Sequence, residues 1–106
     1  MARYVGFRDR GPRSLDAHVS KDGIPLPLAP SYELAKHSPT GFEWGYLGSG
    51  PSQLALALLL DVTGDANTAL QWYQFFKEDH VGTWGTTWQI TTEEIKLWLN
   101  TVGAEG

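Results

Sequence analysis

The sequence contains no cysteine among its 106 residues. This absence excludes disulfide bonds, thiolate metal sites and cysteine nucleophiles, and it is compatible with a reducing compartment. The chain also lacks any run of 18 consecutive apolar residues, and its N-terminal sequence MARYVGFRDRGPR carries charges where a signal peptide has an apolar segment. We therefore expect a soluble, cytoplasmic protein with no membrane partner.

Basic residues are also scarce. The chain has 8 Lys and Arg against 12 Asp and Glu, which gives a formal net charge of -4. Surfaces that bind duplex nucleic acid normally have a basic excess, so direct binding of this kind is disfavoured. All arginines lie near the N-terminus, at Arg3, Arg8, Arg10 and Arg13. These arginines either extend into solvent at the edge of the fold or form an edge that binds anions or docks a partner.

Apolar residues make up 42% of the chain and charged residues 19%, so a packed core is expected. The length fits a single domain spanning residues 1–106. Five Trp, four Tyr and four Phe are more aromatic residues than a small core usually needs. We therefore expect some of them at the surface, available for contact.

Three segments in the first 30 residues predict strands. Ala2–Phe7 is the first, and Leu15–Ser20 and Ile24–Leu28 flank a turn at Asp22-Gly23 that is typical of a hairpin. Three prolines in or beside the last segment limit it to an edge strand, because proline donates no main-chain hydrogen bond.

Gly11-Pro12 interrupts the chain after the first strand, and Ser31–His37 predicts a short helical turn. The segment Gly41–Tyr46 (GFEWGY) alternates between aromatic residues and Glu or Gly. This alternation predicts a half-buried strand with an aromatic face. The predicted face consists of Phe42, Trp44 and Tyr46.

The run QLALALLLDV, from residue 53 to residue 62, is apolar on every side and rich in Leu and Ala. These features favour a helix packed in the core over a strand. Pro51 suits the first turn of this helix, since its missing N–H has no helical partner there. Gly64 is expected to end it.

Two further helices are expected in the second half. Asp65 can cap the helix Ala66–Asp79, and Thr91 with Glu94 forms a capping box for a last helix that ends at Gly103. A short strand at Trp88–Ile90 precedes the capping box. Apolar stripes mark the buried faces at Ala69, Trp72, Tyr73 and Phe76, and at Ile95, Trp98, Leu99 and Val102.

These elements predict an α+β fold. A small, mostly antiparallel sheet from the N-terminal half packs against three helices from the C-terminal half. Segregated strands and helices argue against a doubly wound nucleotide-binding fold.

The octapeptide GYLGSGPS at residues 45–52 has the spacing of a phosphate-binding P-loop, but Pro51 stands where that motif has lysine. ATP hydrolysis is therefore not expected. Three interpretations stay open: a structural helix start capped by Ser49 or Gly50, an anion site at the helix N-terminus, or a protein-contact loop. Main-chain N–H groups near Gly48 and Gly50 would serve an anion, together with the side chains of Ser49, Ser52 and Gln53.

Other candidate chemistry is weak. His18, His37 and His80 are scattered, and Asp16 beside His18 supplies two ligands where a metal site needs more. We expect no catalytic residues, no metal and no cofactor.

Glu43 is either an exposed strand residue or a buried carboxylate that needs a partner, for which an N-terminal arginine is the candidate. Trp84 and Phe75 are the best candidates for exposed aromatic contacts, although each can equally fill a small secondary core.

The stretch Gly41–Asp61 (GFEWGYLGSGPSQLALALLLD) resembles a family of small proteins grouped as a domain of unknown function. Its pattern is close to G-F-x-W-G-Y-x-G-S-G-P-x-Q-L-A-L-A-[IL]-L, and members are found across bacteria, archaea, plasmids and phages. Weaker similarity covers the second half, and the first 40 residues carry little of it. The resemblance implies no assigned activity, only a small accessory protein of mobile elements.

The leading hypothesis is a non-enzymatic binding protein that occupies a protein partner, as a phage or mobile-element inhibitor of host defence would do. The alternative is capture of a phosphate-bearing ligand, a nucleotide or cyclic nucleotide, at the GSGP helix start. A homo-oligomer, in which the partner is a second copy of the chain, is a further alternative. The residues expected to carry binding are Trp44, Tyr46, Gly48, Ser49, Gly50, Ser52 and Gln53, with Arg3 and Arg8 assisting.

Overall fold

The computed structural model describes the main chain of residues 1–10 and 15–103, and the side chains of residues 1–8 and 17–103. The predicted break at Gly11-Pro12 and the arginine at Arg13 lie outside the described residues, as do the side chains of Arg10 and Asp16.

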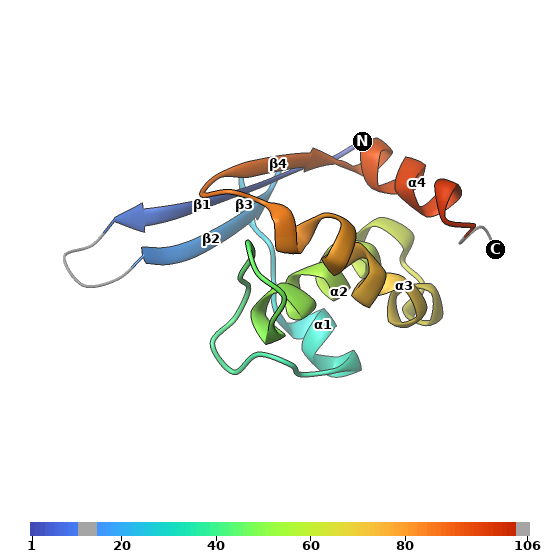
Figure 1. The fold of residues 1–106 in the computed structure, drawn as a ribbon, viewed down its shortest axis with the longest axis horizontal. Coiled ribbons are helices and arrows are strands. Elements are labelled where there is room, and N and C mark those ends of the chain that lie inside the picture. Colours follow the sequence, from blue (N-terminus) through green and yellow to red (C-terminus); the bar gives the residue numbers. More distant parts are fainter. Residues whose placement is uncertain (11–14, 104–106) are drawn as a thin grey trace.

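Within residues 1–10 and 15–103, four strands form one antiparallel sheet with the order β3-β2-β1-β4. The sheet stands on one side of the helices, and the end of β1 and the start of β2 project beyond them (Figure 1). The hairpin at Asp22-Gly23 is confirmed, with both residues at positive φ. The last strand comes from the second half of the chain and pairs with β1. The strands are β1 (Arg3–Arg10), β2 (Leu15–Lys21), β3 (Ile24–Pro25) and β4 (Trp88–Thr91).

The helices between β3 and β4 lie on one side of this sheet, and the last helix continues from the end of β4 (Figure 1). The predicted α+β class is confirmed. The short α1 begins two residues before the predicted turn and has Pro30 at its start. A one-turn 3-10 helix, η1, follows α3. The segments are α1 (Ala29–Leu34), α2 (Ser49–Thr63), α3 (Ala66–Asp79), η1 (Val81–Thr83) and α4 (Thr92–Thr101).

The alternation of side chains along β1 separates its two faces. Tyr4 and Gly6 are buried beneath the helical layer, whereas Arg3 and Phe7 are exposed on the opposite face. The hydroxyl of Tyr4 donates to Asp61 of α2 at 2.5 Å, and Lys21 Nζ lies 2.8 Å from the same carboxylate. Burial, together with the Asp61 carboxylate, raises the pKa of Tyr4 well above its ordinary value. The sheet is thus joined to the central helix by a polar contact.

The prediction of a buried central helix is confirmed. Ten consecutive residues, 50 to 59, are buried in α2, which packs against α1, α3, α4 and η1. An amphipathic stripe would leave one side exposed, so a helix that is apolar all round needs neighbours on every side. Gly64 ends the helix in the left-handed conformation with φ 65°.

The predicted caps are also confirmed. Asp65 accepts a hydrogen bond from Asn67 N and begins α3, and Thr91 with Glu94 forms a complete capping box at α4. These motifs depend on residues two or three apart, which is why the local sequence was sufficient to place them.

The predicted strand at Gly41–Tyr46 is wrong. Gly41 and Gly45 have φ values of 104° and 87°, which an extended strand does not allow. The main-chain N–H of Glu43 donates to Gly50 O at 3.3 Å, and that of Gly45 donates to Val81 O at 3.0 Å, so neither joins a ladder. The aromatic residues do not share a face: Trp44 is 1% exposed, whereas Tyr46 is 52% exposed.

The predicted cap of α2 needs a smaller correction. Gly48 is the N-cap, and Ser49 and Gly50 are the first two helical residues. Gly48 has no side chain to cap the helix, and its carbonyl accepts both the N–H of Ser52 at 3.1 Å and the Ser52 hydroxyl at 3.0 Å. Pro51 stands in the first turn, as predicted.

Candidate functional site

The glycines of the GSGP segment lie against neighbouring side chains. A methyl group added at Gly50 would lie 2.5 Å from Glu43 Cβ, and one added at Gly48 would lie 2.5 Å from the ring of Tyr46. Real Cβ atoms do not approach other atoms this closely. The two glycines therefore allow the chain before α2 to fold back onto the start of the helix.

Gln53 joins α2 to α1 and to the segment that follows α1. Its side chain is fully buried. The amide oxygen accepts from the N–H groups of His37 at 2.7 Å and Ser38 at 3.2 Å. The amide nitrogen donates to Ser31 Oγ at 2.9 Å and Ala35 O at 3.0 Å. An amide has two donors and two principal acceptor positions, so Gln53 has no hydrogen-bonding capacity left for a ligand.

Trp44 and Glu43 are held by Arg8 of β1. The Arg8 guanidinium lies 4.3 Å from the Trp44 ring centroid and donates to the Trp44 carbonyl at 3.2 Å. Arg8 Nη1 also lies 2.7 Å from Glu43 Oε1, and both side chains are largely buried. Of the two interpretations of Glu43, the exposed strand residue is wrong and the pairing with an N-terminal arginine is confirmed. Arg8 is accordingly occupied within the fold.

Trp44 belongs to an extended aromatic cluster. Its ring meets Trp88 edge-on at 5.6 Å, Trp88 stacks on Trp84 at 4.1 Å, and Trp84 meets Phe76 edge-on at 6.3 Å. Phe76 then contacts Trp98 at 5.0 Å. Much of the aromatic surplus therefore fills the core between β4, α3 and α4, and Trp84 is half-buried within it.

His80 lies at the edge of this cluster, 5.1 Å from Phe76 and 6.2 Å from Trp98 between ring centroids. Burial lowers the pKa of His80 from its ordinary value, although the carboxylates of Asp79 and Glu94 oppose the shift. Among the described residues, no three His, Cys, Asp or Glu side chains form a group that could hold a metal ion.

The remaining predicted site residues do not converge. Tyr46 and Ser49 are exposed beside the helix start, while Ser52 is buried and contacts Gln74. Arg3 lies on the open face of the sheet, five residues from Arg8 along β1, which corresponds to about 16 Å of extended chain. The structure brings Arg8, Trp44 and Gly50 into one neighbourhood and leaves Arg3 outside it. A binding role for these residues stays a prediction.

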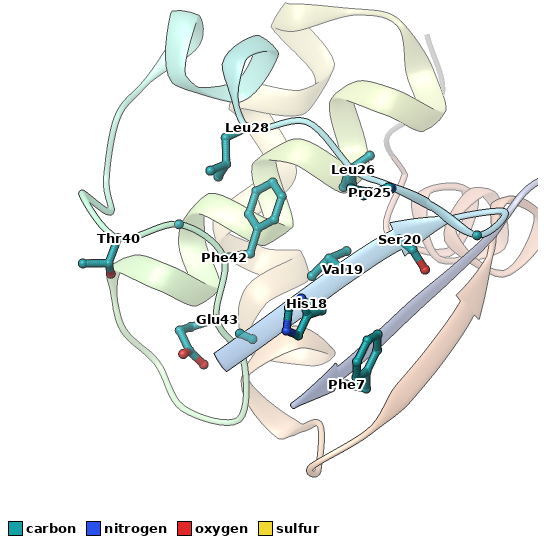
Figure 2. A pocket seen from close by; sticks show the side chains of 13 residues that line it. Phe7, His18, Val19, Ser20, Pro25, Leu26, Leu28, Thr40, Phe42 and Glu43 are labelled. Atoms are coloured by element: carbon teal, nitrogen blue, oxygen red, sulfur yellow. The ribbon is translucent and has the colours of Figure 1, made fainter. Parts of the chain in front are cut away.

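A groove of about 900 Å³ opens on the other side of Glu43. It runs between β2 and the segment from Thr40 to Glu43, with Phe42 pointing into it (Figure 2). The apolar lining is Val19, Leu26, Leu28 and Phe42, and the rim on the sheet side is the stacked pair of Phe7 and His18, whose ring centroids are 4.9 Å apart.

The sequence by itself does not reveal this groove. Its two walls, from β2 and from residues 40–43, are distant in the sequence, and no local motif marks them. One signal was present: the prolines after Ile24 limited β3 to a short edge strand, which leaves the neighbouring part of β2 without a strand beside it. Phe7, 41% exposed, is an apolar residue at the groove rim that was not singled out.

One family model matches the chain over residues 4–101, and its description is "Family of unknown function (DUF6166)". No curated protein and no solved structure matches the chain significantly. Within the described part of the chain, no helix has the length and apolar character needed to cross a membrane.

Proposed function

Since the chain belongs to this family of unknown function, we propose from its geometry that it is a binding protein that acts by occupying a protein partner. The observation that carries this proposal is the groove between β2 and residues 40–43. Binding sites are typically concave and mostly apolar, with a few polar groups to orient the partner. The groove has an apolar floor, with Thr40 and Glu43 at one wall (Figure 2).

The residues at the rim of the groove favour a protein as the partner. Phe7 and His18 stack on the open face of the sheet and extend the groove surface outward. Exposed aromatic side chains are enriched at protein interfaces because they bury a large area with few rotatable bonds. The partner would contact this aromatic pair while an apolar side chain enters the groove beside Phe42.

We place this activity in a small accessory protein of a phage or mobile element, acting on a host defence protein in the host cytoplasm. Two considerations motivate this setting. The resemblance of Gly41–Asp61 noted from the sequence implies a small accessory protein of mobile elements, and the formal net charge of -4 suits competition for a nucleic-acid groove on a basic partner.

The test is a direct binding assay between the purified protein and a panel of purified defence proteins, at low and high salt. We expect at least one to bind, and Phe7→Ser to weaken that binding at least fivefold. Phe75→Ser is the matched control, because Phe75 is a similarly exposed aromatic residue, 54% exposed, on α3 and not on the groove. The proposal fails if no panel member associates, or if both variants bind as the wild-type protein does.

A further inference from the structure

The described residues cover the outer edge of β2 only in part. β3 pairs with β2 at Ser20 and Lys21, and Leu26 N then donates to Val19 O at 2.9 Å. The chain leaves the sheet at Pro27 and turns into α1. From Val19 towards the start of β2, the groove takes the place where β3 would have continued (Figure 2).

The direction of the Val19 carbonyl defines which main-chain groups face the groove. Both polar groups of one residue in an antiparallel strand point to the same side, and successive residues alternate. Val19 therefore faces outward, and so does Ala17. Among the described residues, no hydrogen-bond partner is present for the N–H of Val19 or for the N–H and C=O of Ala17.

We propose that this edge binds an extended peptide segment of the partner protein as an additional strand beside Ala17. This inference rests on the proposed function and specifies the partner's form. An extended peptide presents N–H and C=O groups at the strand spacing, so it can satisfy both groups of Ala17 at once. A lipid chain or an apolar small molecule offers no such pair of groups.

Charge and shape restrict the peptide further. Glu43, the carboxylate at the groove wall, is neutralised by Arg8 at 2.7 Å, so the wall has no net charge to attract an ionic side chain. The floor beside Ala17 is formed by Val19, Leu28 and Phe42. The segment is therefore an uncharged one that directs an aliphatic side chain at Phe42.

The edge is also unprotected against strand addition. Exposed edge strands usually carry lysine, proline or a bulge that prevents another strand from pairing. Ala17, His18 and Val19 include none of these residues, and β1 pairs with them in unbroken register.

The experiment selects binders to the full chain from a displayed library of random 12-residue peptides and measures synthetic copies of the enriched sequences. We expect uncharged sequences with alternating aliphatic residues. Ala17→Pro should weaken their binding at least tenfold, because it removes one outward N–H and obstructs the edge. This N–H takes no part in the β1–β2 ladder, so the fold should tolerate the substitution.

Gln89→Pro is the matched control. Thr92 N donates to Ala2 O, so Ile90 and Trp88 also face β1 and Gln89 faces outward from the opposite edge of the sheet. This variant should bind the peptides as the wild-type protein does. If Ala17→Pro does not fold, hydrogen exchange of the wild-type protein tests whether the peptide pairs with this edge. The amides of Ala17 and Val19 should become protected when an enriched peptide binds.

Enriched peptides that bind Ala17→Pro and wild-type protein equally, or that leave both amides unprotected, would overturn the inference but leave the proposed function standing. Absence of any enriched peptide would also overturn it. Concentration-dependent dimers abolished by Ala17→Pro would assign the edge to a second copy of the chain and reject the partner peptide. Failure of the defence-protein panel, by contrast, bears on the proposed function itself.

Discussion

The side chain of Glu43 lies directly against Gly50 at the start of α2, where a methyl group on residue 50 would come within 2.5 Å of Glu43 Cβ. The contact is reinforced by the hydrogen bond from Glu43 N to Gly50 O at 3.3 Å. The same glutamate pairs with Arg8, so one residue connects β1, the loop before α2 and the helix start. This arrangement explains why the chain has glycine at position 50.

Gly50→Ala should destabilise the protein by about 2 kcal/mol, since it adds a methyl group where the packing leaves no space. Urea denaturation monitored by tryptophan fluorescence measures the change. Gly85→Ala is the matched control, because a Cβ at residue 85 meets no atom within 4 Å. Equal stability of Gly50→Ala and Gly85→Ala would show that Glu43 moves aside without cost.

Nucleotides should not raise the melting temperature. The ring of Tyr46 and the side chain of Glu43 lie against Gly48 and Gly50, and Trp44, 1% exposed, has no free face on which a base can stack. A thermal-shift panel of ATP, GTP and cyclic nucleotides checks this, because ligands that bind the native state tightly must stabilise it. A rise of several degrees that Ser49→Ala removes would instead support the interpretation of the GSGP segment as a phosphate site.

Gln53→Leu should cost about 3 kcal/mol or more. The substitution leaves the N–H groups of His37 and Ser38 and the carbonyl of Ala35 without their buried partner, and each such group costs about 1–3 kcal/mol. Gln71→Leu, at an exposed position of α3, should change stability by less than about 0.5 kcal/mol. Hydrogen exchange at His37 and Ser38 should rise in the Gln53 variant alone. Unchanged exchange there would contradict the assigned role.

The protein should lose stability as the pH is lowered through the range below about 6.5. Burial lowers the pKa of His80 in the folded state, so the unfolded chain, with an ordinary value of 6.5, binds the proton first. Proton uptake by His80 therefore favours unfolding at pH values between its pKa in the unfolded chain and its lower pKa in the folded protein. At pH values above both pKa values the effect is absent. Urea titrations between pH 5 and pH 7.5 measure it.

His80→Asn should reduce this slope in the acid range. At pH 7.5 the histidine is neutral in both states, so comparison of the two proteins there isolates the loss of packing from the loss of titration. An identical slope in wild type and variant would show that other groups cause the acid sensitivity.

Local sequence was sufficient for the elements whose signals lie within one turn of helix or one hairpin. The caps at Asp65 and Thr91, the αL glycine at position 64 and the Asp22-Gly23 turn all depend on neighbours a few residues away. The apolar run after Pro51 could also be assigned, because a helix without a polar side requires burial all round.

The conformation of Gly41–Tyr46 does not follow from its local sequence. Its alternation matches a strand, but its main-chain partners are Gly50 and Val81, and two positive φ values turn it away from the sheet. Propensity and period describe a segment alone, and contacts with α2 and η1 overrode them.

The amino-acid sequence by itself determined the α+β class, the central buried helix and the caps, because each follows from periodicity or from hydrogen bonds between near neighbours. Only the tertiary structure decided that Arg8 neutralises Glu43, that Trp44 is buried and that a groove opens beside Ala17. Those features depend on the distance between β1, β2 and the loop before α2, and that distance is fixed by how the sheet packs on the helices.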